Sequence, residues 1–212
     1  MIYYIIFNII GMLSALIVSK KMREGIKRDL TSEQKLKNMA GLITGAIIGS
    51  KMPVILSYGF NIAVILSSKS IYGALIGAYI GINISKYISG LKGNFGDLYI
   101  LPLCIGIFFG KIGCYFYGCC GSENYPVQIW TAGFHLALFF FFYFIHNHKY
   151  LIGGHFALYM ILYSSYRFCI EFLRTEPRVL LDFTIYQLMA IIFLPYFAYV
   201  LNNRVFKKEV YS

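Results

Sequence analysis

The sequence predicts an all-α integral membrane protein with about seven transmembrane helices. Of its 212 residues, 58% are hydrophobic and only 13% are charged, a composition too apolar for a soluble domain of this length. Apolar runs long enough to cross a bilayer also recur along the whole chain. Because these runs leave little sequence for anything else, we expect a single transmembrane domain over residues 1–212.

The predicted helices follow one another with short polar connections. The first run has no basic segment before it and no small-residue cleavage site after it, so we interpret it as a retained span and not as a signal peptide. In chain order the runs lie at about residues 2–19, 38–58, 71–88, 97–118, 128–145, 151–172 and 183–201.

Basic residues gather in alternate loops, and this pattern predicts an orientation. By the positive-inside rule the first loop is cytoplasmic, the N-terminus lies outside and the C-terminus lies in the cytoplasm. The same placement accounts for the net charge of +10, so we expect no nucleic-acid partner. The residues are Lys20, Lys21, Arg23, Lys27, Arg28, Lys35 and Lys37 in the first loop, Lys86 and Lys92 in the third, Lys149 in the fifth, and Arg204, Lys207 and Lys208 in the tail.

Charged residues interrupt the sixth predicted span, in the segment YSSYRFCIEFLR. Arg167, Glu171 and Arg174 are four and three residues apart, which brings them onto one face of a helix. A charge at mid-membrane costs about 3 kcal/mol on insertion scales, so such a cluster is retained by internal pairing or by function. Lys111 lies in the fourth span, and three cations then face one carboxylate. This excess of positive charge favours an anionic ligand, and a lipid phosphate is the anion available at that depth.

Other polar side chains are predicted at the same depth, in the outer half of the membrane. Tyr72, Gln128 and Gln187 each open a span that runs inward from the outer side, and Lys51 lies in the outer half of the second span. The alternative is that these groups only bridge neighbouring helices and that Arg167 and Glu171 form an intrahelical pair.

Glycines form two patterns. Gly73, Gly77 and Gly81 recur every four residues and predict a stripe for close helix packing, as do Gly106 and Gly110. The segment from Gly118 to Gly121 is expected to form the turn at the outer end of the fourth span, where the backbone can approach a ligand.

The five cysteines do not form a metal-binding pattern, and we expect neither a metal nor a cofactor. Cys114, Cys119 and Cys120 cluster, but no CxxC pair is present and adjacent cysteines chelate poorly. Cys104 and Cys169 are expected to be small apolar fillers. His135 could reach the polar zone, although a buried imidazole with satisfied hydrogen bonds is the favoured interpretation.

The motifs, in this order, resemble those of the prolipoprotein diacylglyceryl transferases, which are bacterial membrane enzymes. YGALIG at 72–77 is similar to the family's (H/Y)GGLIG, GKIGCYFYGCCG at 110–121 to GRIGNFxNGE, and YPVQIW at 125–130 to HPSQLYE. YSSYRFCIEFLR at 163–174 is similar to YGxxRFxxEFxR, and this is the most specific match. FTIYQLMA at 183–190 and IGSKM at 48–52 also resemble family segments, so the similarity covers nearly the whole chain.

The resemblance implies transfer of diacylglycerol from phosphatidylglycerol to the lipobox cysteine of a prolipoprotein, at the outer face of the bacterial cytoplasmic (inner) membrane. It implies that Arg167 and Arg174 bind the phosphate, that Glu171 orients an arginine or the lipid glycerol, that Lys111 takes the place of a signature arginine and that Tyr72 is the general base. The substrate-binding residues that it implies are Lys51, Gly73, Gly113, Cys114, Gly118, Gln128, Tyr163 and Gln187.

The chain also departs from the family pattern. Lys111 replaces an arginine, Cys114 replaces an asparagine, Tyr125 stands where histidine is usual, and Trp130 and Thr131 replace a Tyr-Glu pair. These changes leave an alternative open, in which the chain is a diverged paralogue that binds or transports anionic phospholipid or transfers to a different acceptor.

Overall fold

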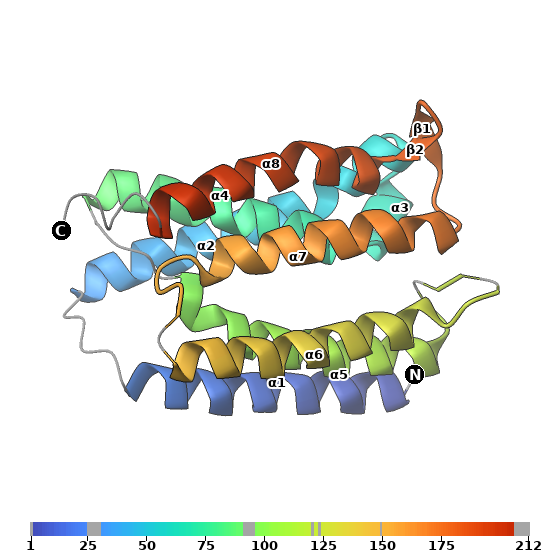
Figure 1. Ribbon diagram of the computed structural model, residues 1–212. Coiled ribbons are helices and arrows are strands. Elements are labelled where there is room, and N and C mark those ends of the chain that lie inside the picture. Colours follow the sequence, from blue (N-terminus) through green and yellow to red (C-terminus); the bar gives the residue numbers. More distant parts are fainter. Residues whose placement is uncertain are drawn as a thin grey trace. The chain divides into compact units, whose positions relative to one another are not determined.

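The computed structural model describes residues 2–24, 31–90, 96–119, 121–122, 124–148 and 150–205. The basic residues that lie outside the described residues are Lys27, Arg28, Lys92, Lys149, Lys207 and Lys208, and Cys120 lies outside them as well. The long helices are α1 (Ile2–Glu24), α2 (Ser32–Tyr58), α4 (Ile71–Ser89), α5 (Ile100–Tyr117), α6 (Val127–Asn147), α7 (His155–Ile170) and α8 (Ile185–Val205) (Figure 1).

Each predicted apolar run overlaps one of these helices, although several of the helices extend beyond the predicted ends. Within the described residues, five helical segments are long and apolar enough to cross a membrane: Ile2–Met22, Ser32–Tyr58, Gly96–Tyr117, Val127–Asn147 and Ile185–Val205. Neither α4 nor α7 belongs to this set, and α7 has only 16 residues where a span needs about 20. The helical class is thus confirmed with five candidate spans, and the number seven stays a prediction.

Short elements join the long helices. A helix, α3 (Ile62–Ser67), follows α2, and the 3-10 helices η1 (Gly96–Tyr99) and η2 (Glu171–Leu173) lie before α5 and after α7. A hairpin of β1 (Arg178–Leu180) and β2 (Phe183–Thr184) precedes α8, with Arg178 opposite Thr184. The predicted start of the last span at residue 183 is therefore wrong by two residues, because Phe183 and Thr184 pair with a strand.

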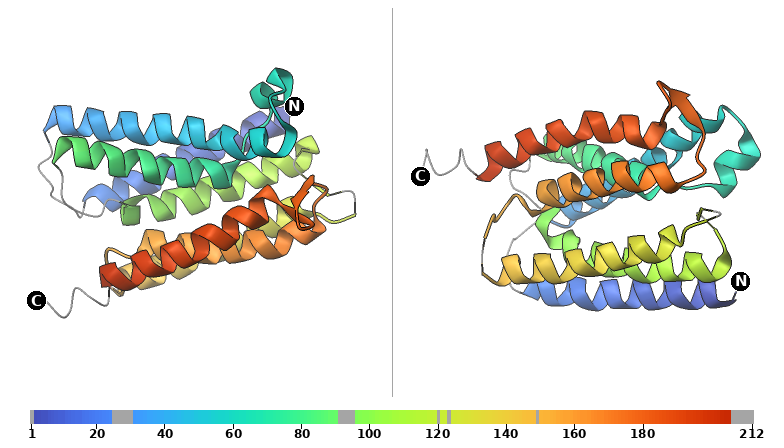
Figure 2. Two further views of the ribbon diagram at one scale, coloured as in Figure 1. Left: turned by 90° about the horizontal axis from the view of Figure 1, so that it is seen from above. Right: turned by 45° about the vertical axis from the view of Figure 1, so that its right-hand side comes forward.

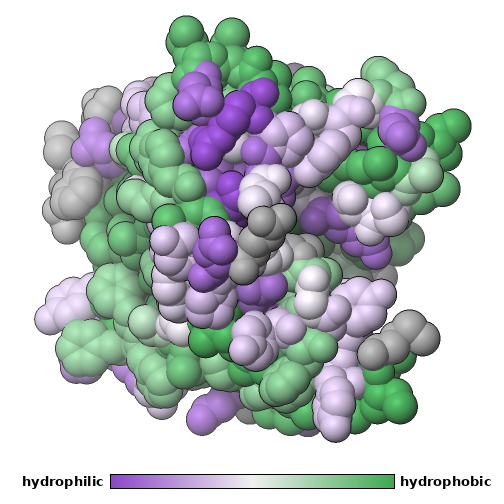
Figure 3. Space-filling model, turned by 90° about the vertical axis from the view of Figure 1, so that its right-hand side faces the viewer, coloured by the Kyte–Doolittle hydropathy of each residue, from purple (hydrophilic) through white to green (hydrophobic). Residues whose placement is uncertain are grey.

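Apolar side chains are exposed along the helices, as expected of surfaces that face lipid. Ile17 is 70% exposed, Ile192 63% and Phe140 61%. Figure 3 shows large hydrophobic areas on the face that it presents. Water would penalise such surfaces, whereas lipid tails would not.

The helices divide into two compact units. Unit 1 comprises Met1–Lys27, Asn94–Thr175 and Ala190–Ser212, and unit 2 comprises Arg28–Gly93 and Glu176–Met189. The expectation of one domain over residues 1–212 stays a prediction.

In unit 1, α5 packs against α1 on one side and α6 on another. Gly113 of α5 lies against α1, where an added Cβ would be 3.1 Å from Cβ of Phe7 and 3.3 Å from the carbonyl oxygen of Tyr4. Phe7 also stacks on Phe116, with ring centroids 5.5 Å apart. The small residues of α5 therefore contact α1, as the glycine spacing predicts for Gly106 and Gly110.

Asp97 ties the start of α5 to the start of α7 within unit 1. Its carboxylate accepts hydrogen bonds from the backbone N–H groups of Gly153 (2.6 Å) and Phe156 (3.3 Å). His155 Nδ1 lies 3.6 Å from the same carboxylate, and His155 Nε2 is 2.7 Å from the carbonyl oxygen of Tyr150. A carboxylate at a helix N-terminus satisfies free N–H groups and complements the helix dipole.

In unit 2, α2 and α4 lie side by side and contact each other through glycines (Figure 2). A methyl group on Gly77 would overlap the carbonyl oxygen of Gly45, and one on Gly81 would overlap that of Gly41. Gly73 meets Gly49 and Pro53 in the same way. The predicted stripe on α4 is confirmed, and its partner is a second stripe on α2 with the same four-residue period.

We expect Gly77→Ala to destabilise the protein by about 1–3 kcal/mol, because the added methyl group forces two backbones apart. Thermal unfolding in detergent micelles, followed by circular dichroism at 222 nm, would measure the change. Gly133→Ala is the matched control, since an added Cβ at Gly133 of α6 meets nothing within 4 Å. Equal effects of the two substitutions would contradict the close contact between α2 and α4.

Candidate functional site

The C-terminal end of α7 brings the predicted charged cluster together. Arg167 Nη2 lies 2.9 Å from Glu171 Oε2, and Arg174 Nε lies 3.6 Å from the same oxygen. The helix ends at Ile170 and continues as η2, so Glu171 and Arg174 keep the side-by-side placement that their spacing predicts. The intrahelical pair between Arg167 and Glu171 therefore forms.

These three side chains are buried. The Glu171 side chain is 0% exposed, that of Arg167 11% and that of Arg174 8%. Removing charges from water is costly, and opposite charges in direct contact offset that cost. One carboxylate between two guanidinium groups leaves a formal net charge of +1, which suits an anion whose oxygens can accept hydrogen bonds from arginine.

Tyrosines of α7 lie beside the cluster. Tyr163 and Tyr166 are both within electrostatic range of Arg167 and Arg174. The hydroxyl of Tyr166 is 3.1 Å from Thr131 Oγ1 of α6, and the Tyr166 ring stacks on Phe134 with centroids 4.1 Å apart and planes 11° apart. Contacts with α6 thus hold the turn of α7 that carries Arg167.

His135 is the buried centre of the α6–α7 contact. Its Nδ1 is 2.8 Å from the carbonyl oxygen of Thr131 and its Nε2 is 3.1 Å from the hydroxyl of Tyr159. A carbonyl oxygen can only accept, so we assign the ring proton to Nδ1, and Nε2 then accepts from Tyr159. The side chain is 0% exposed and has partners at both nitrogens, which agrees with the favoured interpretation of the sequence.

Lys111 of α5 is also buried, with 8% of its surface exposed. It lies within electrostatic range of His135, whose ring centroid is 5.0 Å from that of Tyr163. Lys111 therefore belongs to the same region of unit 1 as the α7 cluster. Cys114, one turn further along α5, is partly exposed, whereas Gly113 faces α1.

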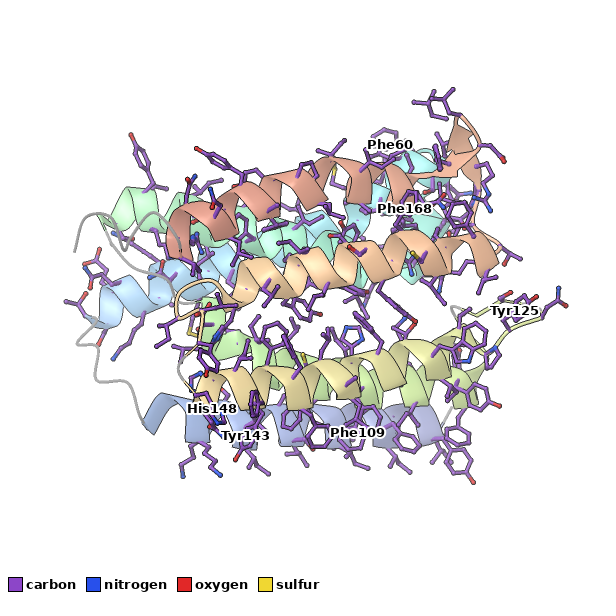
Figure 4. The ribbon with its side chains drawn as sticks, viewed as in Figure 1. Phe60, Phe109, Tyr125, Tyr143, His148 and Phe168 are labelled. Carbon is purple, nitrogen blue, oxygen red and sulfur yellow. The ribbon has the colours of Figure 1, made fainter. Side chains whose placement is uncertain are left out.

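An open pocket of about 520 Å³ lies where α5 ends and α6 begins, the end at which Figure 4 labels Tyr125. Gly118 ends α5 with a φ of +75°, a conformation that favours glycine. Gln128 Nε2 donates to the carbonyl oxygen of Cys119 (3.0 Å), and Gly121 packs so closely on the Gln128 amide that a Cβ would overlap it. The pocket is lined by Tyr115, Gly118, Gly121, Ser122, Asn124, Tyr125, Pro126, Gln128 and Thr175.

The remaining predicted site residues lie in unit 2. Tyr72 is 1% exposed near the start of α4, and Gly73 belongs to the glycine contact with α2. Lys51 Nζ donates to the carbonyl oxygens of Ile65 (2.5 Å) and Ser68 (2.9 Å), at the end of α3. Gln187 Oε1 accepts from the backbone N–H of Thr184 (3.0 Å) and from Arg178 Nη1 (3.3 Å), so it links the hairpin to α8.

Sequence reasoning missed several residues of this region. Tyr166 and Thr131 carry no charge, and only the position of Tyr166 next to Arg167 could have pointed to it. Ser122, Asn124 and Thr175 line the pocket from loops, where no periodic pattern exists. Among the described residues, no group of three histidine, cysteine, aspartate or glutamate side chains is placed to hold a metal ion.

Comparisons with known proteins agree with the resemblance in the motifs. The sequence model of a family described as "Prolipoprotein diacylglyceryl transferase" matches residues 1–202. A phosphatidylglycerol–prolipoprotein diacylglyceryl transferase of Clostridium tetani is 30% identical over 80% of this chain and 79% of its own length. One from Dehalococcoides mccartyi is 30% identical over 82% of this chain and 80% of its own. The phosphatidylglycerol–prolipoprotein diacylglyceryl transferase 2 of Clostridium perfringens is 34% identical, but the aligned region spans only about half of each chain (51%).

We expect Glu171→Ala to destabilise the protein by about 3–5 kcal/mol, because it removes the carboxylate that compensates the charges of two buried guanidinium groups. Glu33→Ala is the matched control. Glu33 also pairs with a cation at i+4, Lys37 (2.6 Å), but its side chain is 74% exposed, and such pairs contribute about 0–1 kcal/mol. Chemical unfolding in mixed micelles would compare the two variants. A cost at Glu171 no larger than at Glu33 would refute the buried ion pair as a stabilising contact.

Proposed function

Because the chain belongs to the prolipoprotein diacylglyceryl transferase family, we propose that it transfers a diacylglyceryl group from phosphatidylglycerol to the lipobox cysteine of a prolipoprotein. The observation that carries this proposal is the buried Arg167–Glu171–Arg174 cluster at the end of an apolar helix, whose excess positive charge suits a phosphate. Lipid and acceptor protein are the two substrates.

The reaction joins one sulfur to one carbon. The acceptor thiol loses its proton to a base. The sulfur then attacks the carbon of the diacylglyceryl group that is bonded to a phosphate oxygen. The carbon–oxygen bond breaks, and glycerol phosphate leaves with the bonding electrons. Negative charge on the phosphate increases in the transition state, and fixed donors in a dry site stabilise such charge by several kcal/mol.

The proposed residue roles follow from this increase of negative charge on the phosphate. Arg167 and Arg174 bind the phosphate, Glu171 holds both guanidinium groups in place, and Lys111 supplies a further positive charge. Tyr72 is the proposed base. The proposed substrate-binding residues are Lys51, Gly73, Gly113, Cys114, Gly118, Gln128, Tyr163 and Gln187.

The proposed membrane arrangement is seven spans within one domain, with the N-terminus outside and the C-terminus in the cytoplasm. It places the reaction at the outer face of the bacterial cytoplasmic membrane. The alternation of basic loops supports this orientation. In unit 1, the shared pocket lining of Tyr115, Gln128 and Thr175 supports a common depth for the ends of α5, α6 and α7.

We expect the purified protein to label a lipobox peptide when it is incubated with phosphatidylglycerol that is radiolabelled in its acyl chains. Mass spectrometry of the product should show one added diacylglyceryl group on cysteine. Absence of transfer beside an active family enzyme, with phosphatidylglycerol still bound to the protein, would instead favour the lipid-binding alternative.

We expect Arg167→Lys to reduce transfer at least about a hundredfold, because lysine lacks the planar fork that binds two phosphate oxygens. Arg204→Lys, in the last turn of α8, is the matched control and should retain activity. Circular dichroism would establish that both variants are folded. Near-normal activity of folded Arg167→Lys would remove Arg167 from its proposed role.

A further inference from the structure

The pocket at the junction of α5 and α6 differs chemically from the cluster at the end of α7. No described residue that lines it carries a charge. Its polar groups are the hydroxyls of Ser122 and Thr175 and the amides of Asn124 and Gln128, and its aromatic walls are Tyr115 and Tyr125. A phosphate would find no cation among these described side chains, whereas neutral amides and hydroxyls would find complementary partners.

The pocket wall is built in advance of any ligand. Gln128 is 7% exposed, donates to the carbonyl oxygen of Cys119, and lies against Gly121 with no room for a side chain between them. These contacts fix Cys119 and Gly121 relative to the first turn of α6. A preformed wall lowers the entropy lost on binding.

The pocket also includes the residue that follows the charged cluster in the chain. Thr175 lines it and follows Arg174 directly in the chain, so their Cα atoms are about 3.8 Å apart. The Arg174 side chain in turn contacts Glu171. One wall of the pocket is therefore built from the residue next to the segment that is proposed to hold the lipid phosphate.

We propose that this pocket binds the acceptor, as an uncharged extended peptide segment that carries the target cysteine. The proposal rests on the proposed function, which requires a thiol to approach a carbon next to the bound phosphate. Backbone N–H and C=O groups of an extended segment pair with the amide and hydroxyl side chains, and its apolar side chains pack against Tyr115 and Tyr125. A volume of about 520 Å³ falls within the range of small-ligand sites and exceeds what a lipid's terminal glycerol fills.

Binding of an unreactive peptide tests the proposal without requiring transfer. The probe is a fluorescent lipobox peptide with serine in place of the target cysteine, and fluorescence anisotropy is measured with the full-length protein in micelles that contain no phosphatidylglycerol. We expect Ser122→Trp, which fills the pocket, and Asn124→Ala, which removes an exposed amide, each to weaken binding about tenfold or more. Asn147→Trp, at the opposite end of α6, is the matched control and should bind as the parent does.

The kinetic counterpart is a tenfold rise in the KM for peptide with an unchanged KM for phosphatidylglycerol. Unaltered peptide binding in both pocket variants would overturn the proposal, and so would a rise in the KM for lipid alone, which would assign the pocket to the lipid head group. If the parent binds the serine peptide through this pocket but transfers nothing, the pocket inference stands and the proposed function fails.

Discussion

The burial of Glu171 between two arginines is the constraint on which the candidate site depends. A carboxylate with no exposed surface requires compensation within the protein, and Arg167 and Arg174 supply it from the same helix end. Because both guanidinium groups face one oxygen, they converge on one point instead of extending toward water. The same arrangement that makes the charges tolerable in an apolar environment thus also concentrates positive charge where an anion can bind.

Contacts within unit 1 hold α7 at its beginning and near Arg167, and so support the placement of the two arginines around Glu171. Asp97 and His155 hold the beginning of α7, and the stacking of Phe134 on Tyr166 holds the turn next to Arg167. His135, with a partner at each ring nitrogen, fills the space between α6 and α7 without adding a charge. The helix that carries the charged cluster is therefore positioned by a carboxylate at its start and by neutral contacts with α6 along its length.

The sequence predicted the helices and the charged cluster well, because both depend on local spacing. Residues 167, 171 and 174 share a face in any helix, and a run of apolar residues identifies a membrane helix wherever it packs. The hairpin before α8 was missed, since it depends on Leu181 and Asp182 adopting positive φ values of 51° and 61°, which leucine rarely does. The partners of Gly77 and Tyr166 were also missed, because the residue spacing within one helix does not indicate which other helix it contacts.

The glycine contact between α2 and α4 has a thermodynamic consequence. The energy of hydrophobic burial comes from water and brings a large change in heat capacity. In the proposed arrangement of seven spans, these two glycine faces meet inside the bilayer and displace lipid tails, so their attraction is mainly dispersion between closely spaced backbones. Separating α2 from α4 would then change the heat capacity very little. Cooling, which weakens water-driven cores, would leave this helix pair nearly as tightly associated as before.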